Sequence, residues 1–143
     1  KHLLAGHFVA IFSGSPQFII DEVGGYLRVH ASIGTRTSIV NGRCTDEIIP
    51  PVIFREGKRS AVERMAAQYD LDLGRSYLYS DSPADTPLFE IVGHPIVVNP
   101  KQAFREVAEH RGWDVVLWQE RASRKERDAE SLAGEEEWES WGA

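Results

Sequence analysis

The sequence has only one cysteine, Cys44, and no apolar run that approaches 18 residues. A single cysteine excludes an internal disulfide and agrees with a reducing compartment. The short runs predict no membrane span, because a helix needs about 20 apolar residues to cross a bilayer. The first residues, Lys1-His2-Leu3-Leu4, do not form a secretory signal. Together these absences predict a cytoplasmic location.

The sequence also lacks a basic surface and several common catalytic patterns. The net charge is −6, with 12 basic and 14 acidic residues in 1–118 and with 4 basic and 8 acidic residues in 119–143. Nucleic-acid binding uses clustered Lys and Arg, so this charge predicts no nucleic-acid partner. No segment reads Gly-x-Ser-x-Gly or Gly-x-Gly-x-x-Gly, and the five histidines do not show zinc spacing.

The sequence does contain short apolar runs rich in β-branched and aromatic residues, at residues 8–12, 76–79, 95–98 and 115–118. Segments with helical spacing lie between them. The apolar positions of these segments are Val62, Met65, Ala66 and Tyr69 in one, and Phe104, Val107 and Ala108 in the other. Alternating strands and helices predict an α/β fold with a Rossmann-like, mostly parallel sheet and helices on both faces.

Three segments depart from this alternation. Lys1 to Ala5 reads as the last turn of a helix, closed by Gly6. Residues 27–51 contain Asn41-Gly42, a strong hairpin signal, and predict a small hairpin excursion. We expect one core domain over residues 1–118 and a charged tail over 119–143, helical or disordered, in which Trp138 and Trp141 are less favoured candidates for contact with a partner.

The first candidate site residue is Ser13, in the turn Ser13-Gly14-Ser15-Pro16 that follows the first apolar run. A strand-to-helix turn of this kind directs backbone amides and the positive end of a helix toward one point, which suits a phosphate. The alternative is an ordinary helix N-cap by Ser15. Pro16 is expected to open the helix, and its inward-facing residues are expected to be Phe18, Ile19 and Val23.

The second candidate is Lys58, which follows Glu56-Gly57 at the start of a predicted helix. A cation at a helix N-terminus is disfavoured by the macrodipole, so its position suggests an anionic partner such as a phosphate or a carboxylate. The alternative is a solvated surface lysine beside Arg59. Gly57-Lys58 is not a P-loop, because Val52 stands where that motif needs glycine.

The third candidate is the pair Asp81 and Asp85, four residues apart after the apolar run 76–79. Open α/β sheets bind their ligands at the carboxyl ends of strands, where these carboxylates are expected. Mg²⁺ takes one or two protein carboxylates together with phosphate oxygens and water. The alternative, a helix cap by Asp81 or Ser82, explains one aspartate but not both.

Ser13, Lys58 and Asp81-Ser-x-x-Asp85, in this order and spacing, resemble the haloacid dehalogenase superfamily, and more closely its phosphoserine-phosphatase-like branch. The resemblance covers about residues 1–118. Phe12-Ser13-Gly14-Ser15-Pro16 is similar to the second motif of that branch, Glu56-Gly57-Lys58 to its third and residues 79–88 to its fourth. Residues 93–100 and Arg111-Gly112-Trp113 resemble the end of these domains.

One motif of the family is missing. Its first motif is an apolar strand that ends in Asp-x-Asp and supplies the nucleophile and general acid, and no such segment is present. In this branch that strand and a helical cap precede the Ser13 motif, and the strand lies between the Ser13 and Asp81 strands. Without it, two strand edges would face each other unpaired. We therefore expect an N-terminally truncated or partial chain.

The resemblance implies a Mg²⁺-dependent phosphomonoester phosphatase that acts through an aspartyl-phosphate on a small phosphorylated substrate. An upstream aspartate would attack, so the chain by itself is expected to be inactive. Ser13, Gly14 and Lys58 would bind phosphate, and Asp81 and Asp85 would form the metal site, with Asp85 positioning a metal water or Lys58. The alternative is a non-catalytic phosphate-binding or regulatory domain. Neither the oligomeric state nor the substrate follows from the sequence.

Overall fold

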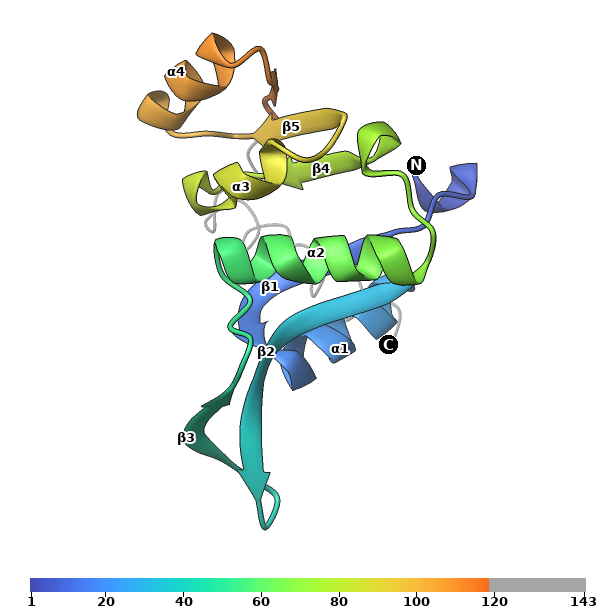
Figure 1. The fold of residues 1–143 in the computed structure, drawn as a ribbon, viewed down its shortest axis with the longest axis vertical. Helices are drawn as coiled ribbons and strands as arrows, with labels where there is room; N and C mark the ends of the chain where they lie inside the picture. Colours follow the sequence, from blue (N-terminus) through green and yellow to red (C-terminus); the bar gives the residue numbers. More distant parts are fainter. Residues whose placement is uncertain (119–143) are drawn as a thin grey trace, which may run out of the picture.

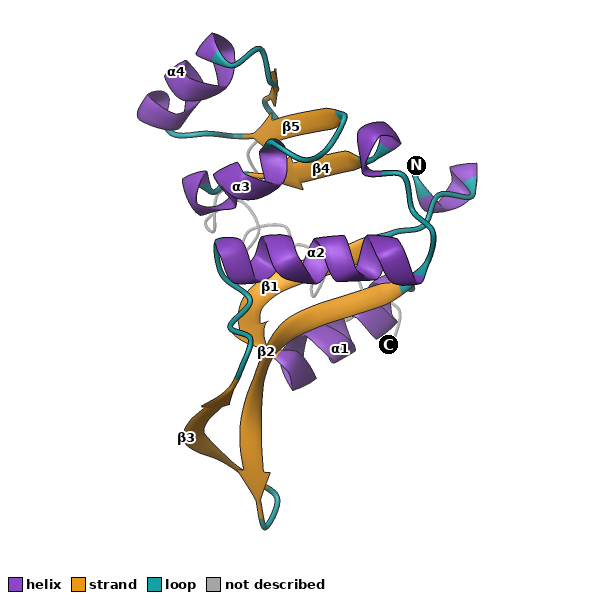
Figure 2. Cartoon of the chain, in the orientation of Figure 1, coloured by secondary structure: helices purple, strands orange, loops and turns teal. Residues whose placement is uncertain are grey.

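The computed structural model describes residues 1–118, and the predictions for the tail over 119–143 lie outside the described residues. Strands alternate with helices, which confirms the predicted α/β fold (Figure 2). None of the described helices has the length and apolar character needed to cross a membrane. The elements are η1 (Leu3–Ala5), β1 (Ala10–Pro16), α1 (Gln17–Leu27), β2 (Ala31–Val40), β3 (Arg43–Ile49), α2 (Glu56–Gln68), η2 (Leu73–Arg75), β4 (Tyr77–Ser80), η3 (Pro83–Asp85), α3 (Thr86–Phe89), β5 (His94–Val98), α4 (Gln102–His110) and β6 (Asp114–Val116).

The strands form two sheets of three strands each. One sheet has the order β1-β2-β3 and the other the order β4-β5-β6. Pairing is parallel except between β2 and β3. Within the described residues β1 and β4 are edge strands and do not pair with each other, which agrees with the expectation that the strand between them is missing. A local sequence pattern can predict a strand, but which strands join into one sheet depends on their neighbouring strands.

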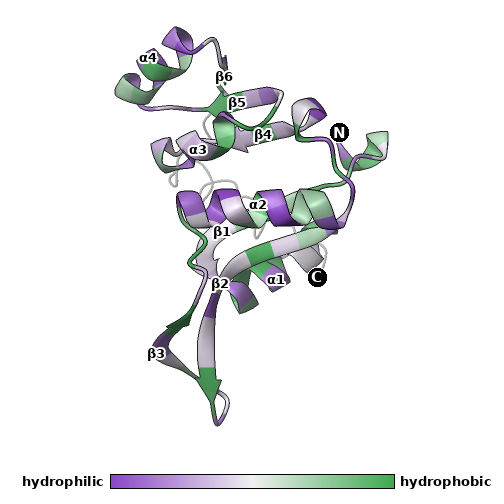
Figure 3. Ribbon diagram, viewed as in Figure 1, coloured by the Kyte–Doolittle hydropathy of each residue, from purple (hydrophilic) through white to green (hydrophobic). Residues whose placement is uncertain are grey.

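The predicted hairpin is confirmed and is an extension of β2. The first half of this strand pairs with β1, as far as Pro16 opposite Thr35, and the second half pairs with β3. Asn41 and Gly42 have φ values of 51° and 75°, the left-handed conformations of a two-residue hairpin turn. The hairpin projects away from the body (Figure 1). The end of β2 near the hairpin tip is hydrophobic in sequence (Figure 3), and its side chains Ile39 and Val40 are 60% and 54% exposed.

A buried cluster lies on one face of the second sheet, where Phe89, Val97, Phe104 and Ala108 pack together. Phe89 of α3 stacks on Trp113 with 4.9 Å between ring centroids. Leu78 of β4 packs against the same cluster. Because side chains alternate along a strand, the neighbours of Leu78 point to the opposite face. This core anchors β4, and with it the loop that carries the two aspartates.

Most of the predicted inward positions of α2 and α4 are correct. Val62, Met65, Ala66, Phe104 and Ala108 are buried. Tyr69 and Val107 were expected on the same faces but are 48% and 41% exposed. Tyr69 is the C-cap of α2, and its ring packs on Phe8 at 4.8 Å between centroids.

The predicted inward face of α1 is wrong. Phe18, Ile19 and Val23 are between 40% and 47% exposed, whereas Ile20 and Gly24 are buried. The helix packs on β1 and β2 through Gly24, where an added Cβ would lie 1.7 Å from the Ser32 hydroxyl oxygen. Gly24, which has no side chain, therefore determines which face of α1 packs on the sheet.

The N-terminal turn is confirmed in part. Gly6 has φ 74° and its amide donates to the Leu3 carbonyl, so it closes a helical turn as predicted, although η1 is a 3₁₀ turn. The turn rests on β4 through His2, whose Nε2 lies 3.0 Å from the Tyr79 hydroxyl. His2 Nδ1 also lies 2.8 Å from His7 Nδ1. Burial of the ring, followed by the neighbouring His7, lowers the pKa of His2.

Candidate functional site

The prediction of a turn at Ser13-Gly14-Ser15-Pro16 is wrong, because β1 continues to Pro16 and Ser13 lies in a bulge of this strand. The register between β1 and β2 shifts between Phe12 and Pro16, so extra residues bulge out at this point. The Ser15 amide donates to the Ser13 hydroxyl over 3.1 Å. α1 begins at Gln17 with Pro16 as its N-cap and no side-chain cap, so neither the N-cap by Ser15 nor Pro16 as first helical residue is seen. Ser13 is half-buried and Gly14 is exposed.

The loop before α2 runs beside this bulge of β1 and fixes the start of the helix. The Ile53 amide donates to the buried hydroxyl of Thr35 over 3.1 Å, which ties the loop to β2. An added Cβ on Gly14 would lie in ordinary contact, 3.5 Å from the Ile53 carbonyl oxygen. At Gly57 it would lie 1.9 Å from the Val52 carbonyl oxygen, so only glycine fits. The close approach at Gly57 holds the following residue, Lys58, in the first turn of α2.

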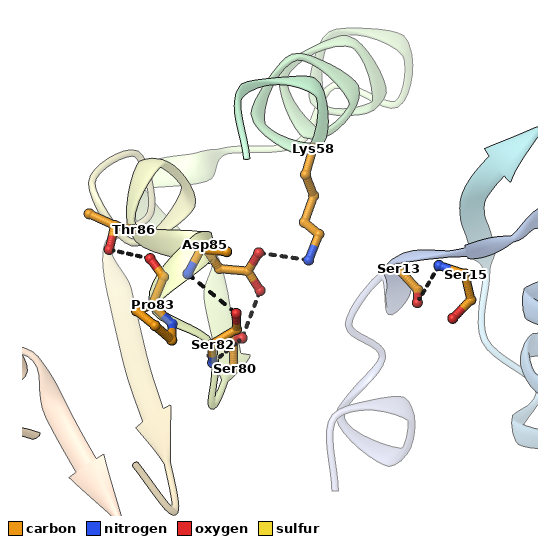
Figure 4. Close-up of polar contacts among 9 residues, drawn as sticks. Ser13, Ser15, Lys58, Ser80, Ser82, Pro83, Asp85 and Thr86 are labelled. Atoms are coloured by element: carbon orange, nitrogen blue, oxygen red, sulfur yellow. Dashed lines mark hydrogen bonds and ion pairs between the residues drawn. The ribbon is translucent and has the colours of Figure 1, made fainter. Parts of the chain in front are cut away.

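Lys58 forms an ion pair with Asp85. Its Nζ lies 2.6 Å from Asp85 Oδ1, and the two side chains are 12% and 8% exposed. The anionic partner that the sequence suggested for Lys58 is therefore a carboxylate of the chain. Figure 4 shows the lysine reaching from α2 toward Asp85, with Ser13 on the other side of its ammonium group. Among residues 1–118 this ammonium makes no other hydrogen bond, so two of its N–H groups can serve an anion.

Asp85 is held by protein groups on both carboxylate oxygens. Lys58 donates to Oδ1, and the Ser80 hydroxyl donates to Oδ2 over 2.7 Å. The Asp85 amide donates to the Ser82 carbonyl over 3.0 Å, which closes the short turn η3. Because the residue is only 6% exposed, these partners offset the cost of removing a charge from water.

Asp81 has a different environment although it is only four residues away. It directly follows β4, its side chain is exposed, and its carboxylate has no hydrogen bond or ion pair within the described chain. The structure thus divides the pair: Asp85 fixes Lys58, and Asp81 is available to a ligand. No group of three or more His, Cys, Asp or Glu side chains that could hold a metal is found in residues 1–118.

Sequence reasoning did not select Ser80 as a site residue. Its hydroxyl donates to Asp85 and accepts from the Ser82 amide over 3.1 Å. The available signal was its position, the last residue of a strand and the one directly before Asp81. A side chain at that position is close to the loop that follows the strand, but only the folded loop shows what it contacts.

Comparison with known proteins identifies the family. The profile of haloacid dehalogenase-like hydrolases matches residues 1–90. The chain belongs to this family. A probable phosphatase of Mycobacterium tuberculosis is 34% identical, and the match covers 88% of this chain and 44% of the relative. A phosphoserine phosphatase of the same species is 31% identical, and the match covers 80% of this chain and 37% of the relative. A crystal structure of a Bordetella pertussis protein with unknown function is 38% identical and has a TM-score of 0.73 over 80% of the chain and 53% of its own.

These findings confirm the resemblance to the phosphoserine-phosphatase-like branch of haloacid dehalogenase-like hydrolases and the fold that it implies. The chain spans less than half of the length of the two M. tuberculosis relatives. It contains the Ser13, Lys58 and Asp81 motifs but no apolar strand that ends in Asp-x-Asp.

Proposed function

We propose that the intact protein is a Mg²⁺-dependent phosphomonoester phosphatase whose phosphate site lies between the Ser13 bulge of β1 and the Asp81 loop. The observation that supports this best is the position of Lys58, whose ammonium is fixed by Asp85 at 2.6 Å and has Ser13 on its other side. A cation held in a fixed position stabilises the negative charge of the phosphoryl group during its transfer better than a mobile cation does.

The residues of this chain have distinct roles in the proposal. The Ser13 hydroxyl and the Gly14 amide bind phosphate oxygens. Lys58 balances the charge of the phosphate and of the incoming nucleophile, so the two anions can approach each other. The nucleophile is an aspartate from outside this chain. Its attack on phosphorus breaks the ester P–O bond, releases the substrate alcohol, which takes a proton from the general acid of the same missing motif, and forms an aspartyl-phosphate. Water then attacks this phosphorus, which releases inorganic phosphate and the free aspartate.

The exposed Asp81 carboxylate fits Mg²⁺, which binds through one or two carboxylates and keeps several waters. Asp81 would hold the ion directly, and Asp85 would act through Lys58 because both of its oxygens already accept hydrogen bonds. The ion supplies further stabilisation of negative charge on the phosphate.

The names of two relatives support a proposal for the class of substrate. One is a phosphoserine phosphatase and another is a histidinol-phosphatase of Neisseria meningitidis, 32% identical over 81% of the chain. We therefore propose a small phosphomonoester as the substrate. The second candidate function is a non-catalytic phosphate-binding or regulatory domain, for which the exposed Gly14 amide and the fixed Lys58 ammonium would be sufficient.

Turnover of p-nitrophenyl phosphate tests the proposal, measured for this chain alone and for the chain extended upstream as its gene encodes it, each with Mg²⁺ and with chelator. The enzyme reading predicts turnover only by the extended protein with Mg²⁺. Turnover by the chain alone, or turnover that survives the chelator, contradicts it. Phosphate binding without turnover in any form supports the second candidate.

A further inference from the structure

We propose that Ser80 is a positioning residue of the phosphate site, which acts on Lys58 through Asp85. This inference rests on the proposed function, but it concerns a residue of the fourth-motif segment to which the resemblance assigned no role. The hydroxyl of Ser80 is the point at which the Asp81 loop and the Lys58–Asp85 pair are joined.

The direction of each hydrogen bond at Ser80 is fixed by its partners. The Ser82 amide, a donor only, lies 3.1 Å from the Ser80 oxygen. The Asp85 carboxylate, an acceptor when ionised, lies 2.7 Å away. The hydroxyl proton must therefore point at Asp85 Oδ2. Among the standard side chains that fit a short strand end, only serine and threonine both donate and accept from one atom.

The two bonds act on the two halves of the site. The bond from the Ser82 amide spans Asp81 and shapes the turn that carries it. The bond to Oδ2 fixes the rotation of the Asp85 carboxylate and leaves Oδ1 facing Lys58, 2.6 Å from Nζ. Loss of the hydroxyl frees the carboxylate to rotate, and the ammonium follows it.

A small displacement of a charge-stabilising group lowers the rate of the catalysed reaction strongly. A misplacement of about 1 Å can cost about 100-fold, so loss of the Ser80 hydroxyl is expected to lower kcat/KM by about 10- to 100-fold. The loss is expected in kcat more than in KM, because Lys58 acts on charge that grows as the phosphoryl group is transferred.

The test compares Ser80→Ala, Ser80→Cys and Ser80→Thr with Ser82→Ala in the protein extended upstream. Cysteine has the shape of serine with a somewhat larger atom and is only a weak donor, and threonine keeps the hydroxyl. Ser82 is a matched control, because its hydroxyl accepts from the Ala84 amide over 3.3 Å and makes no contact with Asp85. Phosphatase kinetics are measured together with the NMR signal of the Lys58 ammonium, which is visible only while hydrogen bonds slow its exchange with water.

The proposal predicts that Ala and Cys at position 80 lower kcat and weaken the Lys58 signal, that Thr restores both, and that Ser82→Ala changes them less. It is overturned if Ser80→Ala loses no more activity than Ser82→Ala, or if the Lys58 signal is the same in Ser80→Ala and wild type. If the wild-type protein shows no turnover, the proposed function fails, and the NMR comparison alone still decides the role of Ser80.

Discussion

Replacement of Lys58 by methionine should destabilise the protein far more than replacement of its neighbour Arg59. The Lys58–Asp85 pair is 2.6 Å long, with side chains 12% and 8% exposed. Removal of one member of a buried ion pair costs about 3–5 kcal/mol, because the remaining charge is left unpaired. Asp85 keeps its hydrogen bond from Ser80, so we expect about 3 kcal/mol, or roughly 10 °C in Tm for a domain of this size.

The assay is urea unfolding of wild type, Lys58→Met, Asp85→Leu and the double variant. The double variant should be more stable than the sum of the single losses predicts, by about 2 kcal/mol, because it leaves no unpaired charge. The control is Arg59→Met, whose pair with Glu63 is 36% and 46% exposed and is expected to contribute less than about 1 kcal/mol. Equal losses for Lys58→Met and Arg59→Met would refute the argument that Asp85 holds a buried lysine.

Three further predictions concern the parts of the fold that support the site. Gly57→Ala should destabilise by about 1–3 kcal/mol because its Cβ would meet a backbone carbonyl, whereas Gly25→Ala, with open space around the Cβ, should be neutral or slightly stabilising; thermal unfolding distinguishes them. Because the pKa of His2 is lowered, its stabilising contribution should be complete above pH 6.5 and decline as the pH falls below that value; an NMR titration should show a higher His2 pKa in His7→Gln. Gln17→Ala should cost about 1–3 kcal/mol in urea unfolding, because its amide donates to one backbone group of β2 and accepts from another.

One local feature of the candidate site could be predicted from the sequence, namely an anionic partner for Lys58. A lysine in the first turn of a helix needs an anionic partner, and Asp85 meets that need. The different roles of Asp81 and Asp85 could not be predicted, because a four-residue spacing says that both lie in one loop and not which one is buried. Burial is decided by η3, which turns Asp85 inward beneath Lys58.

The errors in the fold arise where contacts are distant in sequence. On α1 the larger apolar side chains, such as Phe18 and Val23, suggested the wrong buried face of the helix. Gly24 is buried because β2 approaches it closely, and that approach leaves no pattern within the helix. The division into two sheets is not such an error, since the sequence lacks the strand that was expected between β1 and β4.

A crystal structure of the upstream-extended protein with Mg²⁺ and tungstate, an analogue of phosphate, tests the central claim most directly. We predict an Asp81 oxygen about 2.1 Å from the metal. We also predict tungstate oxygens within hydrogen-bond distance of Ser13 Oγ and Lys58 Nζ. Binding of the metal away from Asp81, or of the anion away from both Ser13 and Lys58, would contradict the account.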